Sequence, residues 1–97
     1  MALVTLSRRA RNWADNQADY LVEHNPRAAE RLQERMAAAI RLLEQFPRSG
    51  SPSRVTGVRR LVMMPYVLTY REAAPDRVII LDIRHGRQRE VALSEDT

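Results

Sequence analysis

The chain has 97 residues, enough for one domain (residues 1–97) with a modest core and too few for two. It has no cysteine, which excludes disulfides and thiolate chemistry, and its two histidines leave little for a metal site. No apolar run reaches the roughly 18 residues of a membrane span, and the N-terminus lacks the long apolar region of a signal peptide. We therefore expect a cytoplasmic domain with no cofactor, no metal and no membrane contact.

The net charge of +4 is unevenly placed along the chain. Residues 1–47 hold 7 arginines against 6 acids, residues 48–89 hold 9 arginines against 3 acids, and residues 90–97 hold 3 acids alone. Every basic residue is arginine, whose planar fork suits phosphate and carboxylate better than lysine does. A GC-rich genome is the plainer explanation for the missing lysine, and anion recognition is the functional one.

The first elements are a short strand at residues 2–7 and a helix from Arg8 to about Glu23. Ser7 is typical of a helix N-cap. Trp13 and Tyr20 lie one heptad apart beside the apolar face of this helix. That face is marked by Ala10, Ala14, Ala18 and Leu21.

The second helix follows at once, because Asn25 suits an N-cap and Pro26 suits the first helical position. Two helices joined this closely must fold back as an antiparallel hairpin. Phe46 and Pro47 end the second helix, and we expect Trp13 and Phe46 to be core residues. The apolar stripe steps by three or four residues through Ala29, Leu32, Met36, Ile40, Leu43 and Phe46.

The rest of the chain predicts three strands. Residues 47–57 are rich in Pro, Gly and Ser and indicate a loop. Residues 58–64 form a strand with Arg59, Leu61 and Met63 on one face, followed by a strand at 66–72. After a tight connection at 73–76, the last strand runs from Arg77 to about His85. The order β-α-α-β-β-β predicts an α+β fold, with the helical hairpin on one face of a mainly antiparallel four-stranded sheet.

The last strand is apolar on both sides, at Val78 and Ile80 on one and at Ile79, Leu81 and Ile83 on the other. Two helices can cover only one face of the sheet. We therefore expect the other face to be partly apolar and to need a partner.

Arginines are the most suggestive candidate site. Arg59, Arg60, Arg71 and Arg84 converge if the three strands are neighbours, and His85, Arg87 and Arg89 extend the group. Such a set fits metal-free RNA cleavage by the ribose 2′-hydroxyl, with arginines stabilising the phosphorane. It also fits binding of phosphate or of an acidic protein. The plain alternative is a set of solvated arginines that pair locally with Glu72, Asp76 and Glu90.

Four blocks resemble the RelE/ParE toxin superfamily over about residues 3–90. They are residues 25–31 (NPRAAER), 46–50 (FPRSG), 66–71 (YVLTYR) and 77–87 (RVIILDIRHGR). The ParE branch is the closer likeness, because its members carry the first, second and last of these blocks together.

The resemblance implies the toxin of a type II toxin–antitoxin pair, held inactive by a small cognate antitoxin encoded next to it. In this superfamily the antitoxin's C-terminal segment wraps the helical hairpin and sheet. ParE-like toxins poison DNA gyrase without being enzymes, whereas RelE-like toxins are endoribonucleases that cut mRNA on the ribosome. Ribonuclease members place an arginine two residues beyond the strand-exit glycine and often a late tyrosine. Here Gln88 follows Gly86 at that spacing and no tyrosine follows Tyr70, which favours the gyrase inhibitor.

A one-residue gap would bring Arg87 or Arg89 into the arginine position, so the ribonuclease stays an alternative, as does an interaction partner without toxicity. If the chain is a ribonuclease, the catalytic candidates are Arg59, Arg71, Arg84, His85 and Arg87. The target-binding candidates are Arg59, Arg60, Arg84, His85, Arg87 and Arg89. The antitoxin-binding candidates are Trp13, Tyr20, Val78 and Ile80.

Overall fold

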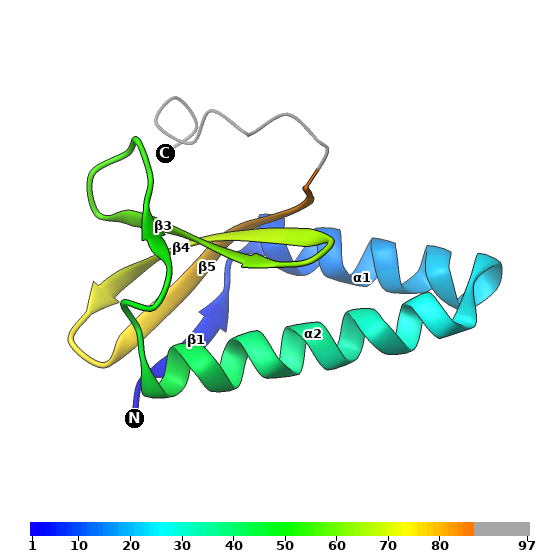
Figure 1. Ribbon diagram of the computed structural model, residues 1–97, viewed down its shortest axis with the longest axis horizontal. Helices are drawn as coiled ribbons and strands as arrows, with labels where there is room; N and C mark the ends of the chain where they lie inside the picture. The colour runs from blue at the N-terminus through cyan, green and yellow to red at the C-terminus, as the bar shows by residue number, and fades with distance from the viewer. Residues whose placement is uncertain (87–97) are drawn as a thin grey trace.

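Two helices and a sheet make up the computed structural model, which describes residues 1–86 (Figure 1). The predicted order of helices and strands is confirmed, with one short strand added between the second helix and the next predicted strand. In chain order the elements are β1 (Leu3–Leu6), α1 (Arg8–His24), α2 (Pro26–Gln45), β2 (Ser51–Pro52), β3 (Val58–Met63), β4 (Tyr66–Ala74) and β5 (Arg77–His85).

The sheet has five strands in the order β1-β5-β4-β3-β2, so the prediction of four strands is wrong by one. β1 pairs with β5 in parallel, and the other three pairs are antiparallel. The added strand β2 consists of Ser51 and Pro52, paired with Arg60 and Arg59. Serine and proline give no strand signal in a sequence, and only the pairing with β3 makes this segment a strand.

Both helices begin at the predicted N-caps. Ser7 Oγ accepts a hydrogen bond from the Ala10 N–H at 3.1 Å and donates one to the Leu81 carbonyl at 2.8 Å. Asn25 Oδ1 accepts from the Ala28 N–H at 3.2 Å, and Pro26 is the first residue of α2. Asn25 alone separates the helices, so they fold back on each other as an antiparallel hairpin (Figure 1).

The helical hairpin covers one face of the sheet, and its turn extends beyond the sheet (Figure 1). The predicted apolar faces point into this layer: Ala10 and Leu21 of α1 and Leu32 and Leu43 of α2 are buried. Ala39, which the predicted stripe did not include, is buried as well. Because this packing fixes where α2 lies, it also places the exposed side chains of that helix.

Phe46 is an exception, because its side chain is 59% exposed although the sequence predicts a core residue. α2 ends at Gln45, and Phe46 is its C-cap with φ −132°. Beyond the last helical residue the 3.6-residue period no longer sets the direction of a side chain. Trp13 is half-buried, with its ring edge-on to Tyr66 at a centroid distance of 5.4 Å.

The helix-facing side of the sheet contains the largest core residues. Leu68, Tyr70 and Ile80 are fully buried and Ile83 nearly so. A shift in register lets Ile80 and Ile83 face the same way although they are three residues apart. Tyr70 pairs with Ile80 and Thr69 with Asp82, which leaves Leu81 unpaired as a bulge.

The opposite side of β5 is a mixed surface. Ile79 is half-buried there, and the polar side chains Asp82 and Arg84 are buried. Val78 and Ile80, which the sequence offers as antitoxin contacts, are 1% and 0% exposed beneath the helices. Those two side chains are therefore not available to a partner in this fold.

Replacing Ser7 with alanine removes both the helix cap and the bond to the Leu81 carbonyl. We expect the free energy of unfolding to fall by about 1–3 kcal/mol. Ser7→Thr keeps the hydroxyl and is the matched control. Urea unfolding followed by circular dichroism measures the difference, and equal stability of the alanine and threonine variants would contradict the role given to Ser7.

Candidate functional site

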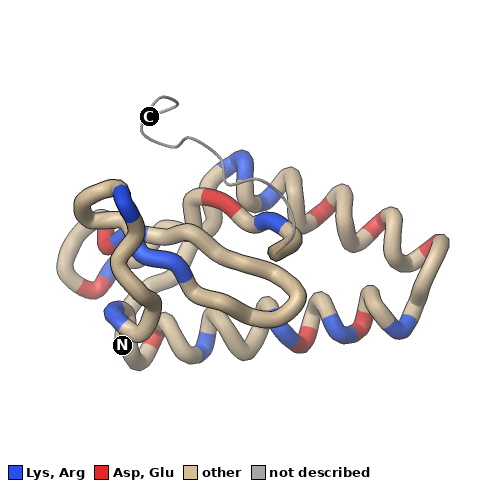
Figure 2. Tube along the Cα trace, turned by 45° about the horizontal axis from the view of Figure 1, so that its top comes forward, with Lys and Arg blue, Asp and Glu red and all other residues tan. Residues whose placement is uncertain are grey.

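The arginines predicted to converge do not meet at one point, although β3, β4 and β5 are neighbours as expected. Side chains alternate along a strand, so Arg59 faces the helix side with Tyr70, its partner in the register. Arg60 points to the other face, together with Arg71 and Arg84. Figure 2 shows arginines spread over both the helices and the sheet. The predicted four-arginine cluster is wrong for Arg59, because adjacent positions 59 and 60 lie on opposite faces, whereas Arg60, Arg71 and Arg84 share the outer face.

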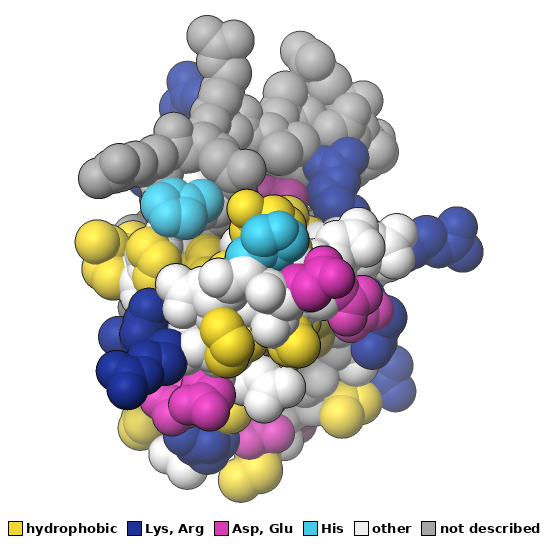
Figure 3. Space-filling view, turned by 90° about the vertical axis from the view of Figure 1, so that its right-hand side faces the viewer, with side chains coloured by type: hydrophobic (Ala, Val, Ile, Leu, Met, Phe, Trp, Pro, Cys, Tyr) yellow, Lys and Arg dark blue, Asp and Glu magenta, His cyan; other side chains and the backbone are white. Residues whose placement is uncertain are grey.

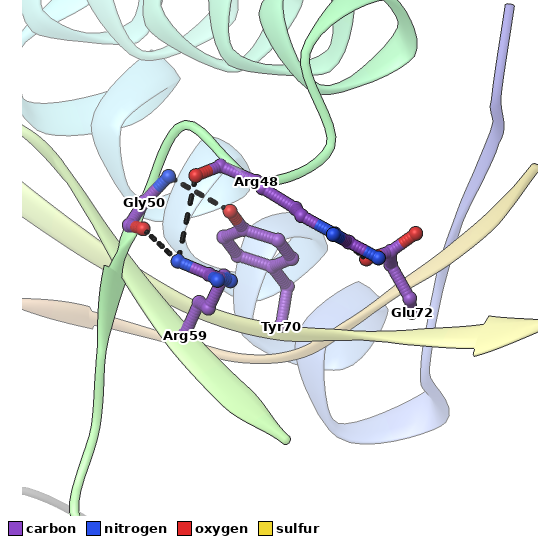
Figure 4. A network of polar contacts seen from close by, with 5 residues as sticks. All are labelled: Arg48, Gly50, Arg59, Tyr70 and Glu72. Atoms are coloured by element: carbon purple, nitrogen blue, oxygen red, sulfur yellow. Dashed lines mark hydrogen bonds and ion pairs between the residues drawn. The ribbon is translucent and has the colours of Figure 1, made fainter.

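Arg59 binds the chain's own backbone. Its Nη1 donates to the Gly50 carbonyl at 2.8 Å and lies 3.4 Å from the Arg48 carbonyl oxygen. Figure 4 shows Arg59 and Tyr70 both directed at this loop. The guanidinium therefore anchors the segment between α2 and β2.

Tyr70 holds the same loop from the side of the core. Its hydroxyl, on a fully buried side chain, accepts a hydrogen bond from the Gly50 N–H at 2.9 Å. A Cβ on Gly50 would lie 2.6 Å from the Arg60 carbonyl oxygen and 2.8 Å from the Tyr70 ring. No other residue fits this close approach, which explains the glycine of the FPRSG segment.

Arg48 reaches outward from the same loop. Its Nε lies 3.0 Å from Glu72 Oε1 on β4, with the two side chains 77% and 31% exposed (Figure 4). The sequence suggests Glu72 as a local partner for one of the strand arginines, but the arginine that pairs with it is Arg48, 24 positions away. An exposed pair of this kind adds about 0–1 kcal/mol at most.

The end of β5 separates Arg84 from His85. Arg84 is 9% exposed on the outer face, with Nη1 3.5 Å from the His85 carbonyl oxygen. The half-buried His85 lies on the helix side, edge-on to Tyr66 at a centroid distance of 5.9 Å. The two candidates thus serve different faces, and the remaining candidates Arg87 and Arg89 lie outside the described residues.

A groove runs between the helical hairpin and the β3–β4 turn, and we call it the His85 groove. Arg35 of α2 closes one side of it, since its Nε donates to the Met64 carbonyl at 3.0 Å. Figure 3 views the molecule from the hairpin turn and shows histidines and hydrophobic side chains between charged ones. The lining includes Leu21, Arg31, Arg35, Pro65, Tyr66 and His85.

The His85 groove combines an apolar floor with cations. Among the described residues that line it there are two arginines and a histidine and no carboxylate. Arg31 and Arg35 are not among the candidates that the sequence suggested. Their spacing of one helical turn puts them side by side, but nothing local reveals that the β3–β4 turn folds against them.

The antitoxin-binding candidates Trp13 and Tyr20 lie apart from each other. Trp13 packs on Tyr66 beside the His85 groove, whereas Tyr20 is 56% exposed and stacks on His24 at 4.2 Å. Neither side chain lines the His85 groove itself, but Trp13 contacts its lining residue Tyr66.

Within residues 1–86, no group of three or more His, Cys, Asp or Glu side chains is arranged to hold a metal ion. The two helices of this part of the chain are too short or too polar to cross a membrane.

Comparison with known proteins shows which family has this sequence and architecture. Residues 4–90 match the family model described as the ParE toxin of the type II toxin–antitoxin system parDE. Y4kP of Sinorhizobium fredii, named as a toxin, is 34% identical over 82 residues, covering 82% of this chain and 83% of its own. A chain of the chromosomal ParDE TA system from P. aeruginosa superposes with a TM-score of 0.72 at 27% identity. That alignment covers 88% of this chain and 96% of the other.

These comparisons assign the helical hairpin on a mixed sheet to a class of protein, the small toxins of bacterial toxin–antitoxin pairs. The chain belongs to the ParE toxin family of type II toxin–antitoxin systems.

Tyr70→Phe removes the buried acceptor of the Gly50 N–H, and we expect it to lower the free energy of unfolding by about 1–3 kcal/mol. Tyr20→Phe is the matched control, because Tyr20 is exposed and should change stability by less than about 0.5 kcal/mol. Chemical denaturation measures both. Indistinguishable midpoints for the two variants would argue against a loop held by Tyr70.

Proposed function

We propose that this ParE-family toxin acts in the cytoplasm by binding and inhibiting DNA gyrase, and that a cognate antitoxin encoded beside it keeps it inactive. The separation of the sheet's cationic side chains carries the proposal. Arg59 is engaged with loop carbonyls, Arg84 is buried on the outer face, and His85 points to the helix side. Phosphoryl-transfer catalysis needs a base and cations converging on one phosphate. Arg60, Arg71 and Arg84 share the outer face, but the histidine that would act as the base lies on the opposite face. This separation of His85 from the outer-face arginines supports inhibition by binding over RNA cleavage.

The target is tested with purified, antitoxin-free toxin in a gyrase supercoiling reaction. We expect loss of supercoiling or accumulation of cleaved DNA at a molar excess of toxin, and full activity once the antitoxin is added. Normal supercoiling at that excess would count against gyrase. Cleavage of translated mRNA by the same preparation would instead establish the RelE-like endoribonuclease acting on the ribosome.

The His85 groove supports the antitoxin half of the proposal. An apolar floor with two guanidinium groups and no carboxylate among its described lining residues fits a segment with hydrophobic and acidic side chains. The chromosomal ParDE system from P. aeruginosa, to which this chain is similar, is a toxin–antitoxin system, which agrees with a protein partner of this kind.

Reversing one charge in the groove tests this docking site. We expect Arg31→Glu to weaken binding of the antitoxin encoded in the neighbouring gene at least tenfold, or about 1.4 kcal/mol, because a carboxylate replaces an attractive cation. Arg41→Glu makes the same change on the same helix outside the groove and is the control. Isothermal titration calorimetry compares the two. Equal affinities for both variants would place the antitoxin elsewhere.

A further inference from the structure

Exposed apolar side chains gather at the end of the molecule opposite the helical turn. The chain's N-terminus lies beside the C-terminal end of α2, where the Ala2 N–H donates to the Glu44 carbonyl at 2.7 Å (Figure 1). Half of the exposed large hydrophobic side chains of the described chain belong to these two segments. They are Met1 (87% exposed), Leu3 (56%), Leu42 (38%) and Phe46 (59%).

A groove forms around Phe46, and we call it the Phe46 groove. Leu42, Phe46 and Pro47 provide its apolar wall, and Arg48 and Glu72 stand at its polar edge. Leu42 and Phe46 are one helical turn apart, joined by the hydrogen bond from the Phe46 N–H to the Leu42 carbonyl at 2.7 Å. An aromatic ring in such a setting is the usual anchor of a protein interface.

The backbone around Phe46 is already fixed. The Ser49 N–H donates to the Phe46 carbonyl at 3.0 Å, and Gly50 is held from both sides by Arg59 and Tyr70. A partner that docks here therefore orders little of the chain, which removes one of the main costs of association.

The charges at the edge of the groove indicate which partner fits. Arg48 and Glu72 lie 3.0 Å apart, so the edge carries one cation and one carboxylate. A strongly acidic or strongly basic partner would meet an unfavourable charge there. Two copies related by a twofold axis avoid this conflict, because each Arg48 can face the Glu72 of the other copy.

We propose that the Phe46 groove is an interface between two copies of this chain. The nearest α2 residues of the two grooves, Arg35 and Leu42, are seven positions apart, or about 10 Å along the helix. The two grooves share no lining residue, so a partner copy on the Phe46 groove leaves the lining of the His85 groove uncontacted in this proposal. The inference does not depend on gyrase as the target or on where the antitoxin docks.

Sedimentation velocity of the full chain tests the interface over micromolar to near-millimolar concentrations. We expect a reversible equilibrium between the 11.2 kDa monomer and a dimer. Phe46→Ser should raise the dimer dissociation constant at least tenfold. Val22→Ser removes an apolar side chain of similar exposure (64%) from the helical hairpin's far end and should leave the constant unchanged. A chain that stays monomeric throughout, or a dimer indifferent to Phe46→Ser, would overturn the proposal.

Charge complementation tests the twofold arrangement itself. Arg48→Glu and Glu72→Arg should each be monomeric alone, because like charges then face each other across the axis. Mixed in equal amounts they should form a heterodimer, since every facing pair is again of opposite sign. Circular dichroism confirms that both variants are folded, and failure of the folded mixture to associate would refute the pairing of Arg48 with the partner's Glu72.

Discussion

The pairing of β5 with β1 on one side and β4 on the other is the constraint on which the rest of the fold depends. It joins the two ends of the described chain: Ser7 and Leu81 are 74 positions apart and share a hydrogen bond. Closing so long a segment costs roughly 4 kcal/mol of chain entropy beyond a constant. Burial of Val78, Ile80 and Ile83 contributes roughly 5–9 kcal/mol, enough to offset it. The helical hairpin lies between the paired strands in the sequence and so must pack on their common face.

Elements with local signals were predictable from the sequence. Ser7 and Asn25 cap the helices as their types suggest, and the alternation of β3 puts Leu61 and Met63 toward the helices. The errors arise where long-range strand pairing or the end of a helix determines the local structure or the direction of a side chain. The strand at Ser51 exists only through β3, and Phe46 turns outward because the helix has ended. For the candidate site, the residue types could be recognised from the sequence. The sheet face on which Arg59 or Arg60 lies depends on the pairing register of the strands, which the amino-acid types alone do not reveal.

Two arginines of this fold donate hydrogen bonds to backbone carbonyls of loops and turns. Arg59 holds the loop after α2 and Arg35 holds the β3–β4 turn, in each case through a carbonyl oxygen of the chain itself. A guanidinium has five donors, so it satisfies carbonyl groups that a short loop leaves without strand or helix partners. The high arginine content therefore reports partly on how the loops are closed. This weakens any inference from arginine number to an anion site.

The length of α2 has a consequence for how such a protein changes over time. With 20 residues the helix spans about 30 Å and separates the surface near Arg31 from the surface near Phe46. Substitutions that far apart, with no shared contacts, have nearly additive effects. One end can therefore drift in sequence to follow a changing partner while the other keeps its shape, so α2 acts as an insulating spacer between two independently evolving surfaces.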